Sequence, residues 1–124
     1  MRDPSGFPRH PIPCAFYRSA AGNEPVREWL LRLPAEERRQ VGIDIKTVQY
    51  GWPLGLPWVD SLGGGLWEIR SRLATRIART LFCFHAGQII LLHGFIKKTH
   101  RPPLHALVQA QRRQREVQGQ PPRR

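Results

Sequence analysis

Three apolar segments separated by short connections constrain the fold of this chain most. They span residues 66–73, 77–85 and 88–96, and they combine aliphatic and aromatic residues with occasional cations. Only Ala86-Gly87 separates the last two, which is the length of a tight β-hairpin turn. The pattern therefore predicts three consecutive strands in an antiparallel sheet.

The first half of the chain predicts helices. Asn23 is a suitable helix cap, because its side chain can accept hydrogen bonds from free backbone amides, and Pro25 suits the first turn. Pro34 ends this helix and can open a second one, in which apolar residues recur at helical spacing until Gly51. We expect a helical hairpin, or one helix broken at Pro34. Residues 104–117 are expected to form a polar, Arg-rich helix or helical tail.

The segments between these elements complete the predicted organisation. Residues 15–18 are consistent with a first edge strand, and the glycines and prolines of residues 52–65 indicate a crossing loop. We expect an α+β fold in which an N-terminal helical hairpin packs on a twisted antiparallel sheet, with a C-terminal helix. A flexible Pro-rich segment (1–14), a single domain (15–118) and a disordered basic tail (119–124) are expected along the chain.

Cysteine usage and hydropathy indicate the compartment. Cys14 and Cys83 lie far apart, and Cys83 sits in the apolar run LFCF, where a free thiol packs as a small hydrophobe. No apolar run approaches the roughly 18 residues that a membrane span needs, and the N-terminus has no signal-type apolar core. We expect a reduced cytoplasmic protein that does not contact membranes.

Charge is distributed unevenly along the chain. Residues 1–69 carry 8 Lys/Arg and 8 Asp/Glu, whereas residues 70–124 carry 12 and 1, so the second half accounts for the net charge of +11. Arginine provides 17 of the 20 cations, and its planar guanidinium suits bidentate phosphate contacts. Nucleic acid is the predicted partner. A solvated basic face, or a sheet edge charged against aggregation, is the alternative.

The alternation of side chains along the first strand sorts its residues onto two faces. Trp67 and Ile69 point one way, while Glu68, Arg70 and Arg72 point the other and are expected to form a solvated face. In the second strand Arg79 opens an otherwise apolar run and requires a partner or a ligand. The third strand leads directly into two lysines, Lys97 and Lys98.

These residues fit the requirements of RNA cleavage without a metal. The reaction needs alignment of a 2′-OH with the adjacent phosphate, a proton acceptor, cations for the developing charge and a donor for the leaving 5′ oxygen. Arg70, Arg79, Lys97 and Lys98 are candidates for the cations and the donor. The base is either Glu68 or a lysine whose pKa neighbouring arginines lower. Glu68 is equally consistent with a cross-strand salt bridge.

Other kinds of site are less well supported. Cys83, His85 and His93 fall on neighbouring predicted strands, but no further ligand completes a zinc site, so we expect no metal or other cofactor. The two tryptophans of the predicted loop, Trp52 and Trp58, either cap the core or provide one ring for base stacking.

Four segments are distinctive in combination: WLLRLPAEERRQVGIDIKTVQYGWPLGLP, LGGGLWEIRSR, IARTLFCF and LLHGFIKKT. In this order and spacing they closely resemble the phage-derived branch of the RelE/HigB toxins of bacterial type II toxin-antitoxin systems. The resemblance covers about residues 15–117. It implies a compact microbial-ribonuclease-like fold and metal-independent mRNA cleavage, commonly on the ribosome, that leaves a 2′,3′-cyclic phosphate and a 5′-OH.

The resemblance also implies roles for individual residues. Arg70 resembles an arginine of the family's second strand, and Arg79 matches the arginine that the family uses to stabilise the phosphate. Lys97 and Lys98 fall where other members place a basic or aromatic catalytic pair, and Glu68 occupies a position that is basic in some members. Further contacts to the RNA are expected from Arg72, Arg76, Thr99 and Arg101.

Partners follow from the same resemblance. A toxin of this kind is expected to act on mRNA and the ribosome and to be neutralised by a cognate antitoxin, commonly a helix-turn-helix protein. Operator DNA would be contacted only through the antitoxin in the complex. Two alternatives are a noncatalytic RNA- or ribosome-binding module and an inactive phage-derived relative.

Overall fold

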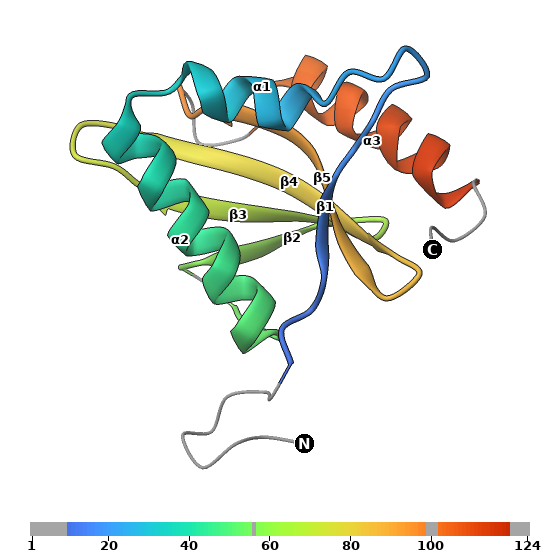
Figure 1. The fold of residues 1–124 in the computed structure, drawn as a ribbon, viewed down its shortest axis with the longest axis horizontal. Coiled ribbons are helices and arrows are strands. Elements are labelled where there is room, and N and C mark those ends of the chain that lie inside the picture. Colours follow the sequence, from blue (N-terminus) through green and yellow to red (C-terminus); the bar gives the residue numbers. More distant parts are fainter. Residues whose placement is uncertain (1–9, 56, 99–101, 120–124) are drawn as a thin grey trace.

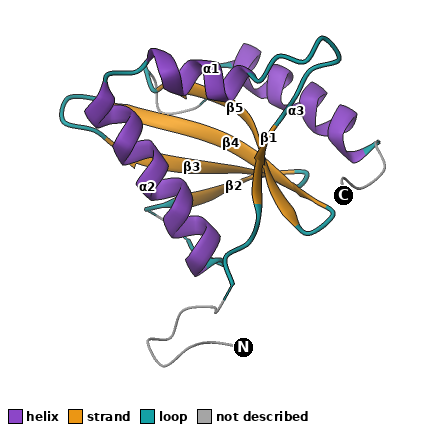
Figure 2. Cartoon of the chain, viewed as in Figure 1, coloured by secondary structure: helices purple, strands orange, loops and turns teal. Residues whose placement is uncertain are grey.

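The computed structural model describes residues 10–55, 57–98 and 102–119, which form three helices around a five-stranded sheet (Figures 1 and 2). The sheet has the strand order β1-β5-β4-β3-β2. The strands are β1 (Cys14–Phe16), β2 (Val59–Gly63), β3 (Leu66–Arg72), β4 (Ile77–His85) and β5 (Gln88–Ile96), and the helices are α1 (Pro25–Arg32), α2 (Ala35–Gly51) and α3 (Leu104–Gln118). The predicted α+β class is confirmed.

The three strands predicted in the second half are confirmed as an antiparallel meander, β3-β4-β5. Ala86 and Gly87, which connect β4 to β5, have φ angles of 52° and 76°. Both residues therefore have a left-handed backbone conformation, as a tight type I′ hairpin turn requires. Glycine adopts this conformation without steric cost.

Two features of the sheet differ from the expectation. The edge strand β1 pairs in parallel with β5, with Ala15 opposite Ile90, so the sheet is mixed rather than wholly antiparallel. A parallel neighbour is possible because two helices and three strands separate β1 from β5 in the chain. Residues 52–65 are not only a loop, since β2 lies among them and pairs with β3. The glycines and prolines around this short strand hide it in the sequence.

The predicted helical hairpin is wrong, although Pro34 separates the two helices as expected. α1 packs on β5 and α2 packs on β3, because each helix uses its apolar stripe to cover a different part of the sheet (Figure 1). Pro25 occupies the first turn of α1, but Asn23 does not cap it. The backbone N–H of Asn23 instead donates to Oγ of Ser19.

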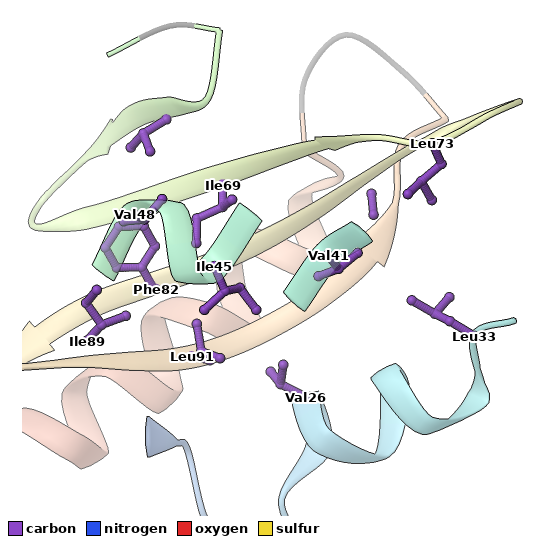
Figure 3. Packing of buried hydrophobic residues seen from close by; sticks show 12 residues of the cluster. Val26, Leu33, Val41, Ile45, Val48, Ile69, Leu73, Phe82, Ile89 and Leu91 are labelled. Atoms are coloured by element: carbon purple, nitrogen blue, oxygen red, sulfur yellow. The ribbon is translucent and has the colours of Figure 1, made fainter. Parts of the chain in front are cut away.

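Each face of the sheet has its own apolar cluster. α1 and α2 cover the first face, where Val26 and Val41 pack with Ile69 and Phe82 of the sheet (Figure 3). α3 covers part of the second face, here called the α3 face, so it is a packed helix rather than a tail. Its buried Ala110 lies against a second cluster, which includes Leu66, Leu81, Cys83, Ile90 and Leu92. Among the described helices, none combines the length and apolar character that a membrane span requires.

Candidate functional site

The strand register gathers arginines on the α3 face. Arg70 of β3 lies opposite Arg79 of β4, so both side chains leave the sheet on the same side. Their neighbours Ile69 and Ala78 belong to the core of the opposite face, which fixes the direction of the arginines. The backbone N–H of Lys97 donates to the carbonyl of Ile77 (2.7 Å), so the residue that follows β5 lies beside the start of β4.

These strand ends form a cationic groove of about 540 Å³. Four predicted site residues line it: Arg70, Arg72, Arg79 and Lys97. The remaining lining residues are Gln40, Asp44, Pro57, Trp58 and Ile77, which come from α2, from the segment before β2 and from the start of β4. The α3 face therefore has two halves, an apolar half beneath α3 and an open half that carries Arg70, Arg72 and Arg79. The groove includes this open half and also reaches Gln40 and Asp44 of α2, the helix on the opposite face.

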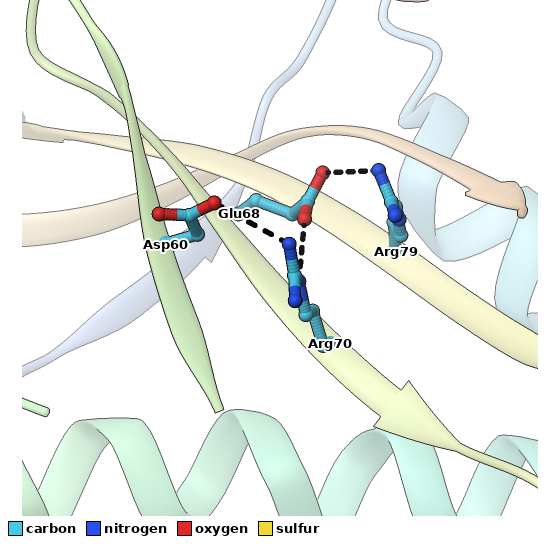
Figure 4. Close-up of polar contacts among 4 residues, drawn as sticks. All are labelled: Asp60, Glu68, Arg70 and Arg79. Carbon is cyan, nitrogen blue, oxygen red and sulfur yellow. Dashed lines mark hydrogen bonds and ion pairs between the residues drawn. The ribbon is translucent and has the colours of Figure 1, made fainter. Parts of the chain in front are cut away.

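Glu68 connects the two arginines of the groove wall (Figure 4). One of its oxygens accepts a hydrogen bond from Nη1 of Arg79 (3.2 Å), and the other accepts one from Nε of Arg70 (3.0 Å). Arg70 also donates from Nη2 to Asp60 on β2 (3.3 Å). The side chains of Glu68 and Arg79 are only 1% and 2% exposed, whereas that of Arg70 is 35% exposed. Two guanidinium groups are thus held in fixed orientations by one buried carboxylate.

This arrangement corrects the predicted solvated face. Alternation assigns Glu68, Arg70 and Arg72 to one side correctly, but only Arg72 is exposed. Glu68 is fully buried because it lies opposite Leu81, near the apolar half of the face. The salt bridge that the sequence allowed for Glu68 is present, and it supplies the partner that Arg79 was expected to require.

A second hollow, of about 520 Å³, continues the groove along the sheet end. It shares Arg72 and Lys97 with the groove and adds Arg76 and Lys98. Arg76 forms a two-point ion pair with Glu37 of α2, with distances of 2.6 and 3.0 Å. Two other predicted contacts, Thr99 and Arg101, lie outside the described residues.

The groove and its surroundings fall within a region that matches a known protein family. The family model described as "Phage derived protein Gp49-like (DUF891)" matches residues 28–115. The chain belongs to this Gp49-like family. The match begins in α1 and ends in α3, so it includes all the residues that line the groove of this Gp49-like protein. No curated protein matches the chain significantly.

Asp44 is a groove residue that the sequence analysis of this Gp49-like protein missed. Partial burial raises the pKa of its carboxyl above the ordinary range, and Nε2 of Gln40 donates to it from one helical turn away (3.1 Å). The spacing offered a signal, because the apolar stripe of α2 is Val41, Ile45 and Val48 and leaves Gln40 and Asp44 beside it. Among the described residues that line the groove, Asp44 is the one that carries a carboxylate.

The half beneath α3 contains a separate polar cluster. Arg113 donates from Nη1 to the carbonyl of Leu92 (2.7 Å) and lies 3.3 Å from Nδ1 of His93. Its guanidinium also lies 5.2 Å from the ring centre of Tyr17, whose hydroxyl donates to Glu116 (2.5 Å). Burial, together with the charge of Arg113, lowers the pKa of His93 to about 4, so its imidazole is neutral at pH 7. This cluster joins α3 to the sheet.

Thiol and metal chemistry receive no support from the described part of the chain. Burial raises the pKa of Cys14 to about 12 and that of Cys83 to about 11, so both thiols stay protonated at pH 7 and are poor nucleophiles. Within residues 10–55, 57–98 and 102–119, no three His, Cys, Asp or Glu side chains are grouped so that they could hold a metal ion.

Proposed function

We propose that this Gp49-like protein is the toxin of a type II toxin-antitoxin system and that it cleaves mRNA on the ribosome without a metal. The observation that carries the proposal is the groove, in which Arg70, Arg72, Arg79 and Lys97 meet at one end of the sheet. The resemblance of the sequence to the phage-derived branch of RelE/HigB toxins, and membership of a phage-derived family, support it.

The groove suits a polyanion whose phosphates must be held in one position. Glu68 fixes the guanidinium groups of Arg70 and Arg79 before any ligand binds, so little reorganisation is needed when negative charge develops beside them. Arg72 and Lys98 extend the positive surface along the ends of the β-strands. Neighbouring phosphates of the same RNA molecule can bind there.

The reaction is an attack of a ribose 2′ oxygen on the adjacent phosphorus. The bond from phosphorus to the 5′ oxygen breaks, which leaves a 2′,3′-cyclic phosphate and a 5′-OH. Arg79 and Lys97 stabilise the charge on the phosphate oxygens, and Lys97 or Lys98 donates the proton that the leaving 5′ oxygen needs. The proton of the 2′-OH passes to a base on the enzyme.

Asp44 is better placed than Glu68 to be this base. Both oxygens of Glu68 already accept hydrogen bonds from arginines, and its side chain is only 1% exposed, so neither oxygen is open to the 2′-OH of a bound RNA. Asp44 lines the groove, and its raised pKa makes it a stronger acceptor. In this proposal Glu68 is a positioning residue that orients Arg70 and Arg79.

A toxin of this kind acts in the cytoplasm and needs an antitoxin. The positive groove would attract an acidic segment of a cognate antitoxin as it attracts RNA. Any contact with operator DNA would then be made by the helix-turn-helix antitoxin in the complex.

The proposal is tested with a matched pair of lysine variants. Lys97→Ala removes a groove cation, whereas Lys46→Ala removes a lysine on the outer side of α2 that lines no part of the groove. In a cell-free translation reaction, wild type and Lys46→Ala are expected to cleave mRNA, and Lys97→Ala to cleave it at least about 100-fold more slowly. Mapping of the RNA ends should show a cyclic phosphate and a 5′-OH.

The same experiment separates the alternatives. Binding of wild type to ribosomes or RNA without any cleavage would replace the proposal with a noncatalytic binding module. Neither binding nor cleavage would indicate an inactive relative. Equal cleavage by Lys97→Ala and wild type would show that the groove is not the active site.

A further inference from the structure

Trp58 differs from the other three tryptophans of the chain. Trp29, Trp52 and Trp67 pack against the core of the α1/α2 face, and the rings of Trp52 and Trp67 meet edge to face with centres 4.9 Å apart. Trp58 is 48% exposed and lines the cationic groove. Its ring therefore does not serve as a core cap, which was one of the two roles that the sequence allowed.

The backbone holds Trp58 firmly beside the arginines. Its carbonyl accepts a hydrogen bond from the N–H of Arg70 (2.8 Å), and its own N–H donates to Gly55 (3.2 Å). The next residue, Val59, is 2% exposed and lies in the core opposite Ile69. Trp58 is the residue directly before β2, and its side chain lines the same groove as that of Arg70.

We propose that Trp58 is a stacking platform for an unpaired base of the RNA whose phosphate the groove arginines bind. The inference rests on the proposed function and specifies its substrate as single-stranded RNA. An indole next to cations can hold a base by its flat face while the cations hold the backbone. Bases within a duplex are already stacked on their neighbours, so paired RNA would use the cations alone. Because every base has such a face, Trp58 would place the strand without selecting its sequence.

The test measures binding rather than cleavage, so that it does not depend on the chemistry. A short 2′-O-methyl oligoribonucleotide has no free 2′-OH and cannot react by the proposed route. Its dissociation constant is measured for wild type, Trp58→Ala and Trp58→Phe. Leu31→Ala is the control, because Leu31 is 55% exposed on α1 and lines no part of the groove. Thermal unfolding checks that all variants are folded.

We expect Trp58→Ala to weaken binding about 5- to 150-fold, Trp58→Phe to weaken it less, and Leu31→Ala to leave it unchanged. An abasic scan then identifies the stacked base. One abasic position should weaken binding to wild type by a similar factor and should have no effect on binding to Trp58→Ala, because the partner ring is already missing.

Each outcome bears on a defined claim. Equal affinities of wild type and Trp58→Ala, or equal sensitivity of both to every abasic position, would overturn the stacking role and leave the cationic groove intact. Wild type that binds no oligonucleotide would overturn the stacking role and would also count against RNA as the ligand. A blunt-ended RNA duplex, in which every base is paired, should bind wild type and Trp58→Ala with the same affinity.

Discussion

The two halves of the α3 face each contain a buried arginine, but the surroundings of the two arginines differ. Arg113, on the buried side of α3, is 8% exposed, and it contacts a carbonyl, a neutral imidazole and an aromatic ring. Arg79, in the open half, is 2% exposed and is paired with the carboxylate of Glu68. Arg113 joins α3 to the sheet, whereas Arg79 lines the groove together with Arg70, Arg72 and Lys97.

The comparison shows that one surface of the sheet holds both an arginine that only stabilises packing and arginines that a ligand can reach. Burial disfavours the charged form of Arg113 and lowers its pKa. Its contacts come from Leu92 and His93 of β5 and from the ring of Tyr17. In the open half a buried carboxylate balances the charge of Arg79, while Arg70 and Arg72 remain accessible at the groove. A cation can therefore be structural in one half and be available to a ligand in the other.

The largest expected effect concerns Asp44, the proposed base, which lines the groove from α2. Asp44→Asn keeps the shape of the side chain and an acceptor for Gln40, but it removes the proton acceptor, so single-turnover cleavage should fall about 10²- to 10⁴-fold. For wild type, the rate should fall as the pH drops through the pKa of Asp44, at a pH above the ordinary aspartate value of about 3.9. Glu116→Gln, in the half beneath α3, should change neither the rate nor its pH profile.

A rate for Asp44→Asn close to that of wild type would assign the base elsewhere. In that case the dependence of the rate on pH would show which group is the base. If a lysine were the base, the rate would begin to fall at a pH far above the range in which carboxyl groups titrate.

The second prediction concerns a variant that lacks the carboxylate beside Arg79. Glu68→Leu leaves a buried guanidinium without its carboxylate partner and should lower the free energy of unfolding by about 3–5 kcal/mol. Adding Arg79→Met to the same chain replaces the pair with apolar side chains and should recover most of that loss. Urea denaturation measures the stability, and both variants should lack cleavage because the phosphate contact is disturbed or absent.

A double variant as unstable as Glu68→Leu would mean that the pair is not the main source of the effect. Cleavage by the double variant at the wild-type rate would remove Arg79 from the proposed mechanism while leaving its structural role.

The third prediction concerns the arginine that joins α3 to the sheet. Arg113→Met removes the hydrogen bond to the carbonyl of Leu92 and the contact with Tyr17, and should cost about 1.5–3 kcal/mol of unfolding free energy. The cleavage rate should be unchanged, because Arg113 lies outside the groove. The adjacent Arg112→Met is the control, since Arg112 is half exposed and its ion pair with Glu116 is long, at 3.7 Å. A loss of activity in folded Arg113→Met would contradict the division of the face into two halves.

The sequence predicted the elements of this face better than their surroundings. Alternation placed Glu68, Arg70 and Arg72 on one side of the sheet, because side-chain direction along a strand depends only on its periodicity. That Arg79 lies on the same side follows only from the register of β3 and β4. It could not predict that Glu68 is buried, since its burial depends on its neighbours across the sheet, Leu81 and Arg79 of β4. Asp44 was missed for a similar reason: it reaches the groove only because α2 packs on β3. The strand β2 was hidden by its glycines, and with it the position of Trp58.

The smallest expected effect is the salt dependence of RNA binding. Arg72→Gln removes an exposed cation from the open half, so one fewer counterion is released when single-stranded RNA binds, and the slope of log affinity against log salt should become shallower by about 0.7. Arg112→Gln removes an exposed cation of α3, outside the groove, and should leave the slope unchanged. Arg76→Gln should fall between them, because Glu37 already balances most of the charge of Arg76. Equal slopes for Arg72→Gln and Arg112→Gln would mean that RNA contacts the whole basic surface, and the open half would then have no special part in binding.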